Sequence, residues 1–378
     1  MFADTGFGSP HYGAGSLAEL VPSVLASLGV PNEPATLDLP PVRRACVLLV
    51  DGMGWELLAA HRFHAPFLSS LLDTAGPITA SFPTTTATSL TTLGTGLPPG
   101  HHGIVGLQVA LPGTDRVMHQ LRWAPDVDPE TWQPRRTAYQ RAEEAGVTTG
   151  YVAFGGYEGT GLSRASARGS RYVPANDITE LAVKAGTALA EGDRSLVVVY
   201  HSDLDTYGHM CGVDSPYWRL HLGHVDRLAE QLATQLPPDA ALYVTADHGM
   251  VDSTPASRID VESDPELSAG VRVLAGEARV RHVHTRDGAA DDVLAAWRAK
   301  LSGRAEVITR DEAVAGGLFG GVADAVLPRI GDILALARGE TALVAPRAEP
   351  TQSALVGQHG SLTPEELRVP LLRASTVL

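Results

Sequence analysis

The chain has 378 residues, of which 44% are hydrophobic, so it can bury a large core shared between roughly two structural units. The formal net charge of −14 argues against a general nucleic-acid-binding surface, which needs a basic face. No segment approaches the ~18 uninterrupted apolar residues of a membrane span, and the first residues lack a secretory signal. We therefore expect a cytoplasmic protein without a membrane anchor, in which Cys46 and Cys211 form no disulfide.

Short branched apolar runs alternate with helical stretches along most of the chain. The first forty residues precede this pattern, are rich in proline and glycine, and are expected to wrap the surface. Near-continuous apolar strands are buried on both faces of a parallel sheet, and their alternation with helices predicts an α/β sandwich. Strands are expected at 45–52, 148–156, 194–203 and 240–249, and helices at 178–192 and 217–236.

The segment 251–356 has a different pattern. It contains two expected strands in VRVLAGEARVRHVHT, a helix in DDVLAAWRAKLSG and a further strand in RIGDILALARG. This favours a smaller α+β cap or insertion, with 1–250 and 357–378 forming the catalytic core. The alternative is that the segment continues the main sheet. His282 and His284, in the alternating run VRHVHT, are expected to face solvent or an interface.

Three of the four expected strands of the core end in aspartate. Asp51 follows the first, Asp203 and Asp205 follow the third, and Asp247 follows the fourth. The carboxyl ends of parallel strands meet at one edge of a sheet, so these side chains are expected to crowd together. Crowded carboxylates resist ionisation unless a cation lies among them. Any one of them, taken alone, is more readily explained as the cap of a helix or turn.

Histidines accompany these aspartates. His209 lies four residues after Asp205, so both would share one face of a helical turn, and His248 directly follows Asp247. A third histidine, His359, is flanked by glycines in GQHG, which would let the backbone approach a ligand closely. Carboxylate and imidazole ligands suit zinc, manganese or iron, and two such sets suggest a site for two divalent metal ions.

The run SFPTTTATSLTTLGTG, residues 81–96, holds seven threonines and no charge. A strand, a loop and the hydroxyl-bearing edge of a reaction centre all fit this composition. The loop LPPGHHGIVG follows directly, so His101 and His102 are candidate substrate contacts.

Taken in order, LLVDGMG, the threonine run, GTGLPPGHHGIVG, DTYGH, VTADHGM and GQHG make the chain resemble the alkaline phosphatase superfamily. Within it, the chain is most similar to the type I phosphodiesterase and nucleotide pyrophosphatase branch, over about residues 45 to 375. The resemblance implies a central, mostly parallel sheet sandwiched by helices. It also implies two divalent metals, zinc in the first place with manganese or iron as alternatives, and a serine or threonine nucleophile.

The resemblance implies a role for each residue of these motifs. The nucleophile stands ten residues before the glycine that closes its helix, which gives Thr86 when counted back from Gly96. Thr86 would also bind a metal ion, at the start of a helix whose positive end favours phosphate. Thr85 and then Thr84 are the alternative nucleophiles. The six metal ligands would be Asp51, Asp247 and His248 for one ion and Asp205, His209 and His359 for the other.

The implied function is a metal-dependent phosphodiesterase or nucleotide pyrophosphatase that forms a phosphothreonine intermediate on a small phosphate ester or nucleotide. A phosphomonoesterase or phosphonate C–P hydrolase on the same core is the alternative, and a metal- or ligand-binding module without turnover is a third possibility. The oligomeric state is not predicted.

The chain departs from its relatives at one point of the motif pattern. Nucleotide pyrophosphatases commonly carry a phosphate-binding asparagine shortly after HGI, whereas HHGIVG is followed here by Leu107 and Gln108. Gln108 would have to take its place, and the diester preference is open for this reason. The candidate substrate contacts are thus Thr85, His102 and Gln108. Trp297 and the segment around Phe319 are expected to shape the leaving-group pocket.

Overall fold

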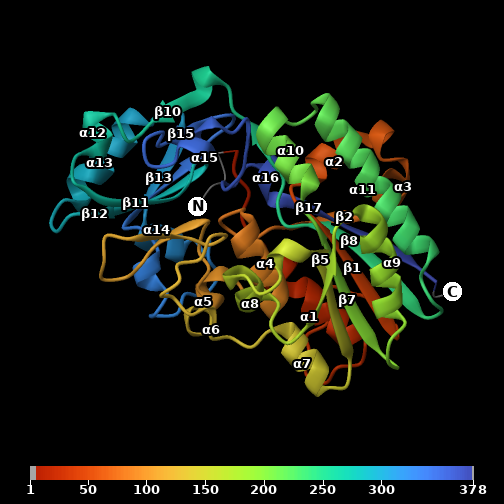
Figure 1. The fold of residues 1–378 in the computed structure, drawn as a ribbon. Coiled ribbons are helices and arrows are strands. Elements are labelled where there is room, and N and C mark those ends of the chain that lie inside the picture. The colour runs from red at the N-terminus through yellow and green to blue at the C-terminus, as the bar shows by residue number, and fades with distance from the viewer. Residues whose placement is uncertain (1–5, 377–378) are drawn as a thin grey trace.

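The computed structural model describes residues 6–376, and a seven-stranded sheet lies at the centre of its larger part (Figure 1). Five strands run parallel, and β17 pairs antiparallel with both β8 and β2. In spatial order the strands are β2 (Gly76–Thr79), β17 (Arg368–Ser375), β8 (Ala240–Ala246), β1 (Arg44–Val50), β7 (Ser195–His201), β5 (Thr148–Phe154) and β6 (Arg171–Ala175).

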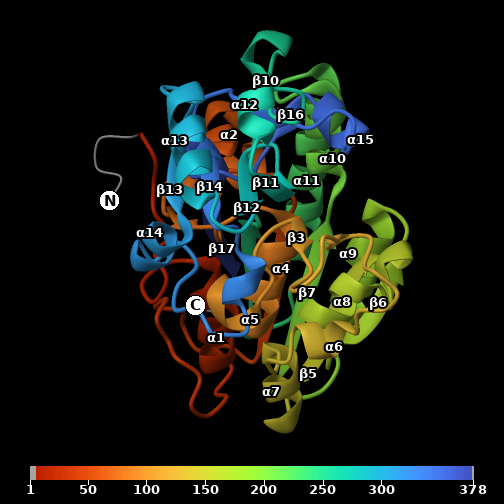
Figure 2. The same ribbon diagram turned by 90° about the vertical axis from the view of Figure 1, so that its left-hand side faces the viewer.

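Helices cover both faces of this sheet, as Figures 1 and 2 show from two directions. The predicted α/β sandwich with a mostly parallel sheet is therefore confirmed. One face carries α2 (Trp55–Ala60), α3 (Pro66–Leu72), α9 (Ile178–Leu189) and α11 (Pro216–Thr234). The other carries α1 (Leu17–Ser27), α4 (Thr86–Thr95), α7 (Ala138–Glu144) and α8 (Gly161–Ser166).

The central strands are apolar because both of their faces are buried. β7 and β8 are buried at every position, and β1 at every position after Arg44. In the register of the sheet, Val50 of β1 lies between His201 of β7 and Ala246 of β8. The residues that follow these three positions therefore leave the sheet at the same height, on its carboxyl edge.

The expectation that the first forty residues wrap the surface is wrong for α1. This helix begins with a capping box, in which Ser16 and Glu19 satisfy each other's backbone N–H groups. Leu17, Leu20 and Val24 are fully buried in the main core, and α1 packs against α4. The apolar residues of LAELVPSVLAS recur at helical spacing, and this pattern buries the segment although prolines and glycines flank it.

The segment that follows β8 builds a second, smaller sheet, at the left of Figure 1. It is antiparallel, in the order β11 (Val271–Glu277), β12 (Val280–Thr285), β14 (Ile333–Ala337) and β13 (Ala305–Thr309). The segment thus forms a sheet of its own, and the alternative that it continues the main sheet is wrong. Its helices are α12 (Pro265–Ser268), α13 (Ala290–Lys300) and α14 (Arg310–Ala315).

The smaller sheet has its own apolar core, in which Trp297 is 1% exposed. His282 and His284 do not face solvent, because β12 lies between β11 and β14 and both imidazoles are buried. The boundaries of this unit at 251 and 356 stay a prediction.

Short paired segments join the two sheets and complete the chain. They are β9 (Val251–Asp252) with β16 (Gly357–Gln358), β10 (Arg258–Asp260) with β15 (Ala342–Val344), and β3 (Gln108–Ala110) with β4 (Val117–His119). The remaining helices are α5 (Pro99–His102), α6 (Pro129–Trp132), α10 (Asp203–Cys211), α15 (Pro350–Ala354) and α16 (Pro364–Leu367). Cys46 and Cys211 are free thiols, and within residues 6–376 no helix combines the length and apolarity needed to cross a bilayer.

Candidate active site

Two carboxylates and one imidazole meet where β1 and β8 end. Asp51 and Asp247 directly follow register partners in the sheet, which brings their side chains together. Nε2 of His248 lies 3.3 Å from Asp51 Oδ1 and 3.3 Å from Asp247 Oδ2. The backbone N–H of Gly52 donates to Asp247 Oδ1 over 3.1 Å. Gly52 has φ +76°, and a Cβ there would lie 3.0 Å from Cβ of Asp205, so this turn needs glycine.

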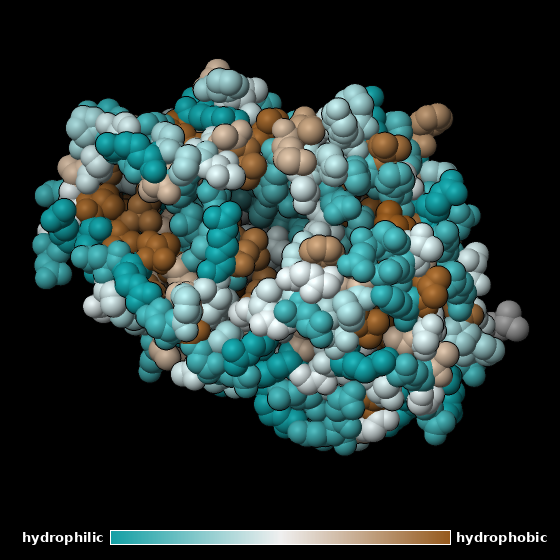
Figure 3. All heavy atoms as spheres, in the orientation of Figure 1, coloured by the Kyte–Doolittle hydropathy of each residue, from teal (hydrophilic) through white to brown (hydrophobic). Residues whose placement is uncertain are grey.

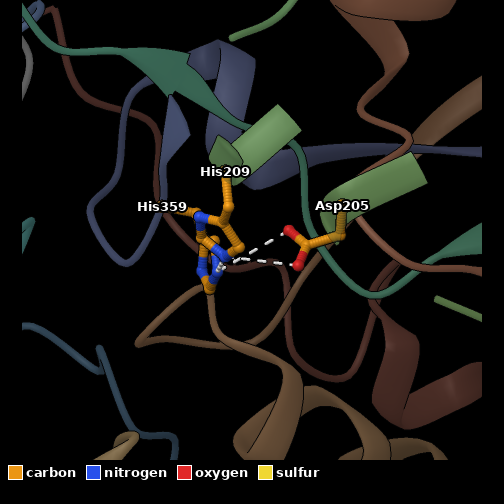
Figure 4. A group of neighbouring side chains, drawn as sticks. All are labelled: Asp205, His209 and His359. Carbon is orange, nitrogen blue, oxygen red and sulfur yellow. Dashed lines mark hydrogen bonds and ion pairs between the residues drawn. The ribbon is translucent and has the colours of Figure 1, made fainter. Parts of the chain in front are cut away.

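A second group of three side chains lies beside the first. Asp205 and His209 stand one turn apart on α10, and His359 reaches them from the loop that follows β16 (Figure 4). Asp205 Oδ2 is 3.2 Å from His209 Nε2, and Nε2 of His359 is 3.3 Å from Nε2 of His209. The rings of His248 and His359 stack with centroids 3.7 Å apart, so the two groups are neighbours.

The three histidines of these groups are oriented in the same way. Nδ1 of His209, His248 and His359 lies 2.7, 3.0 and 2.8 Å from the backbone carbonyl oxygen of Gly357, Gly249 and Thr84, respectively. A carbonyl oxygen only accepts, so in the neutral imidazole Nδ1 carries the proton and Nε2 has the lone pair. All three Nε2 atoms face the carboxylates, which is the arrangement that metal-binding histidines adopt.

The donor atoms of the two groups fit cations. Each group offers three ligand atoms within 4.8 Å of one another: Asp51, Asp247 and His248 in one, and Asp205, His209 and His359 in the other. Three buried carboxylate oxygens, one from each aspartate, accept no hydrogen bond within the described residues. Buried anionic oxygens and facing imidazole lone pairs repel one another, and a divalent ion in each group removes both penalties. Mixed N and O ligands of this kind suit zinc, manganese or iron.

Crowding shifts the acid–base behaviour of both groups. Burial, followed by the charge of Asp247, raises the pKa of Asp51 well above its ordinary value, and burial raises the pKa of Asp247 as well. Burial favours the neutral forms of Asp205 and His209, but the attraction between their charged forms is stronger than this effect. The pKa of Asp205 is therefore lowered and that of His209 is raised. Burial and the charge of His248 lower the pKa of His359 well below the usual range.

The threonine run supplies one hydroxyl to the first group. Residues 86–95 form α4, so the run is helical rather than a strand, and Thr86 is its first residue. Thr86 Oγ1 lies 3.4 Å from Asp51 Oδ2 and 3.3 Å from His248 Nε2. The helix N-terminus and this hydroxyl therefore point at the same carboxylate edge, where the helix dipole favours an anion.

A cavity of about 260 Å³ opens onto these groups. Its wall includes Asp51, Thr86 and His359 together with four leucines and three tyrosines that make much of it apolar: Leu90, Leu107, Leu121, Leu162, Tyr151, Tyr157 and Tyr200. Among the described residues of this wall, none is lysine or arginine. The face of the molecule in Figure 3 is mostly hydrophilic and is hollowed between the part that carries α10 and the part that carries α4.

The predicted substrate contacts lie at different distances from this cavity. Thr85 lines it, and its buried hydroxyl has no hydrogen-bond partner within the described residues. His102 is buried behind α4, with Nε2 2.9 Å from Thr92 Oγ1. His102 and Gln108 are both absent from the described lining residues, so the geometry gives these two predictions no support.

The expected roles of Trp297 and Phe319 in the leaving-group pocket are wrong. The indole of Trp297 donates to the carbonyl oxygen of Leu267 inside the smaller core, and the ring of Phe319 packs edge-on against Phe82. Large apolar residues in the second unit pack its own core and its contact with the first unit, and the sequence does not distinguish this role from pocket lining.

Sequence reasoning missed Tyr200. Its hydroxyl donates a short hydrogen bond to Asp51 Oδ2, and its ring lines the cavity. The signal was present in LVVVYHSD, because a tyrosine at the second-last position of a fully buried strand needs a partner for its hydroxyl.

The sequence model of the type I phosphodiesterase/nucleotide pyrophosphatase family matches residues 45–362. The chain belongs to this family. Residues 45–362 contain all six candidate metal ligands and Thr86, and the family's dependence on metal ions agrees with the two ligand groups. The protein is therefore a hydrolase of the phosphodiesterase/nucleotide pyrophosphatase family. Comparison with curated proteins gave no significant match.

Solved structures share the fold of this family member at low sequence identity. Murine ectonucleotide pyrophosphatase/phosphodiesterase 5, as an inactive variant in complex with AMP, is 21% identical over 87% of each chain, with a TM-score of 0.68. Phosphonoacetate hydrolase from Sinorhizobium meliloti 1021, in complex with phosphonoformate, is 19% identical over 89% of this chain and 91% of that chain, with a TM-score of 0.67.

Proposed function

We propose that the protein is a phosphodiesterase or nucleotide pyrophosphatase that works through a phosphothreonine on Thr86 at a two-metal centre, with zinc as the expected ion. The observation that carries the proposal is the position of the Thr86 hydroxyl at the N-terminus of α4, 3.4 Å from Asp51 Oδ2 and 3.3 Å from His248 Nε2. A hydroxyl in this place is within reach of a phosphoryl group held by the two ligand groups.

The residues of the chain have distinct tasks in this reaction. Bound divalent ions would supply positive charge that lowers the pKa of the Thr86 hydroxyl and of a water molecule, and that offsets charge on the phosphoryl oxygens. Thr86 Oγ1 gives up its proton and attacks phosphorus, the bond from phosphorus to one organic group breaks, and that group leaves as an alcohol once it has taken up a proton. The phosphoryl group, which still carries the second organic group of the diester, is then bonded to Thr86. A water molecule then hydrolyses the phosphothreonine and restores the hydroxyl. Backbone N–H groups at the start of α4 help to hold the nonbridging oxygens.

The wall of the cavity favours a diester over the alternatives. The cavity residues Leu90, Leu107 and Leu121 offer apolar contact to an organic group attached to phosphorus. A monoester dianion or the carboxylate of a phosphonocarboxylate would benefit from an arginine or lysine clamp, and the described lining residues provide none. A phosphonate substrate is supported by the fold shared with phosphonoacetate hydrolase. A shared fold is weaker support than the composition of the cavity wall.

The proposal is tested with purified, metal-loaded protein on bis-p-nitrophenyl phosphate, p-nitrophenyl phosphate and phosphonoacetate. Thr86→Ala should lower kcat on the preferred substrate by at least about 10³-fold while elemental analysis shows an unchanged metal content. Thr85→Ala is the matched control, since Thr85 lines the same cavity, and it should stay within about tenfold of the unmodified protein. Acid-quenched turnover of bis-p-nitrophenyl phosphate should place a p-nitrophenyl phosphoryl group on Thr86, and full activity of Thr86→Ala would refute the proposal.

A further inference from the structure

The hairpin that joins β11 to β12 leaves the smaller sheet and ends against the active-site loops of the larger unit. Its residue Glu277 is 6% exposed, and Oε2 accepts a hydrogen bond from the backbone N–H of Leu107 over 2.8 Å. Leu107 lines the cavity. Oε1 of Glu277 has no hydrogen-bond partner within the described residues. A buried carboxyl group thus connects the smaller unit to the cavity wall.

The other side of the same hairpin lies against the loop that carries His359. Gly360 has φ +137°, and a Cβ at this position would lie 2.8 Å from Cγ of Glu277 and 3.2 Å from Cβ of Arg279. Glycine is needed here for the backbone conformation and for the close approach. The guanidinium of Arg279 forms a fully buried ion pair with Glu366, 2.8 Å between Nη2 and Oε2, which holds the hairpin in place.

Gly360 is hydrogen-bonded to the threonine run at Thr84. Its N–H donates to Thr84 Oγ1 over 3.0 Å, and its carbonyl oxygen accepts from the N–H of Thr84 over 3.1 Å. Thr84 in turn accepts from Nδ1 of His359 and stands two residues before Thr86. Glu277 therefore touches both sides of the site, the apolar wall through Leu107 and the His359 loop through Gly360.

We propose that Glu277 is a positioning residue, through which the smaller unit holds Leu107 in place and so sets which organic group of a diester the cavity accepts. This inference rests on the proposed phosphodiesterase function. Burial raises the pKa of Glu277 to about 8, which leaves the side chain uncharged at neutral pH. Glutamine is therefore its closest substitute, because its amide oxygen accepts from the N–H of Leu107 in the same way.

The kinetic test compares a diester with a large organic group, bis-p-nitrophenyl phosphate, and one with a small group, methyl p-nitrophenyl phosphate. Glu277→Ala should raise KM about tenfold for the first and no more than about twofold for the second, because only the larger group reaches Leu107. Glu277→Gln should restore KM to within about twofold. An equal change in KM for both diesters, or no rescue by glutamine, would overturn the proposal.

Hydrogen–deuterium exchange gives a readout that does not need activity. In Glu277→Ala the amide of Leu107 loses its acceptor, so peptides that contain it should exchange at least about tenfold faster. The matched control is Glu349→Gln, which perturbs another buried carboxylate of the smaller unit, paired with Arg281, and should leave this peptide unchanged. If the alanine variant does not fold, Glu277→Met keeps the packing against Gly360 and still cannot accept from Leu107.

The two proposals fail in different ways. An unmodified protein that turns over neither diester refutes the phosphodiesterase function, and the exchange experiment still decides whether Glu277 holds Leu107. An active protein whose Leu107 peptide exchanges at the same rate in Glu277→Ala refutes the role of Glu277 alone.

Discussion

Removal of metal ions should destabilise the protein strongly, because the two ligand groups bring three aspartates together in the folded chain. A ligand at about 1,000 times its Kd stabilises the folded state by about 4 kcal/mol, so two ions contribute about 8 kcal/mol. An unfolding entropy of about 2.1 cal/mol/K per residue gives about 0.8 kcal/mol/K for this chain. Chelation should therefore lower Tm by about 10 °C.

The decrease in Tm on chelation should depend on pH. In the metal-free protein the pKa values of Asp51, Asp247 and His209 are raised, so these groups hold protons that a metal ion must displace. A group whose folded pKa is raised stabilises the metal-free protein fully below its unfolded pKa, and this contribution is lost as pH rises through the folded pKa. In metal-bound protein these groups carry no such proton, so its stability does not decrease with pH for this reason. The gap in Tm between metal-loaded and chelated protein should therefore widen as pH rises above the ordinary pKa values of these groups.

Scanning calorimetry of the protein with and without EDTA, with metal content measured in parallel, checks both expectations. Zinc added back in excess of the chelator should restore Tm. Asp205→Asn removes one ligand of the second group and should shrink the effect of EDTA. A Tm that EDTA does not change, or a gap that narrows as pH rises, would show that these carboxylates do not bind metal ions.

Two substitutions test neighbouring features. Tyr200→Phe removes the hydrogen bond to Asp51 and should weaken metal affinity or kcat by about 10–100-fold, measured by metal titration and steady-state kinetics. Gly94→Ala places a Cβ against the carbonyl oxygen of Ser166 and should cost about 1–3 kcal/mol in urea unfolding, whereas Gly76→Ala, with open space around it, should change stability by less than about 0.5 kcal/mol. Unchanged kinetics and metal affinity in the first variant, or equal stabilities of the two glycine variants, would contradict these contacts.

The sequence predicted the sheet and four of the candidate metal ligands because both follow from patterns within short segments. Apolar runs with aspartate at their ends place Asp51 and Asp247 on one sheet edge, and a four-residue spacing places Asp205 and His209 on one helix face. The role of His359 came only from the resemblance, since nothing local shows where its loop returns.

Other features depend on contacts between distant segments and left no readable pattern. His282 looked exposed because alternation in VRHVHT is typical of a half-buried strand, yet Phe319 and Gly331, from a later part of the same unit, lie against its ring and leave it 2% exposed. Nothing in the sequence around Glu277 distinguishes it from an ordinary charged residue. Its burial comes from the meeting of the hairpin with Leu107 and Gly360, which are far away in the sequence.

The position of β17 has a consequence for how the enzyme matures on the ribosome. This strand lies between β8 and β2, so β2 has no neighbour in the sheet until residues 368–375 have been synthesised. His359 also emerges late, long after Asp205 and His209. A nascent chain can therefore bring the first ligand group together once His248 has left the exit tunnel, but the second stays incomplete until His359 has followed, so the two groups are completed in that order.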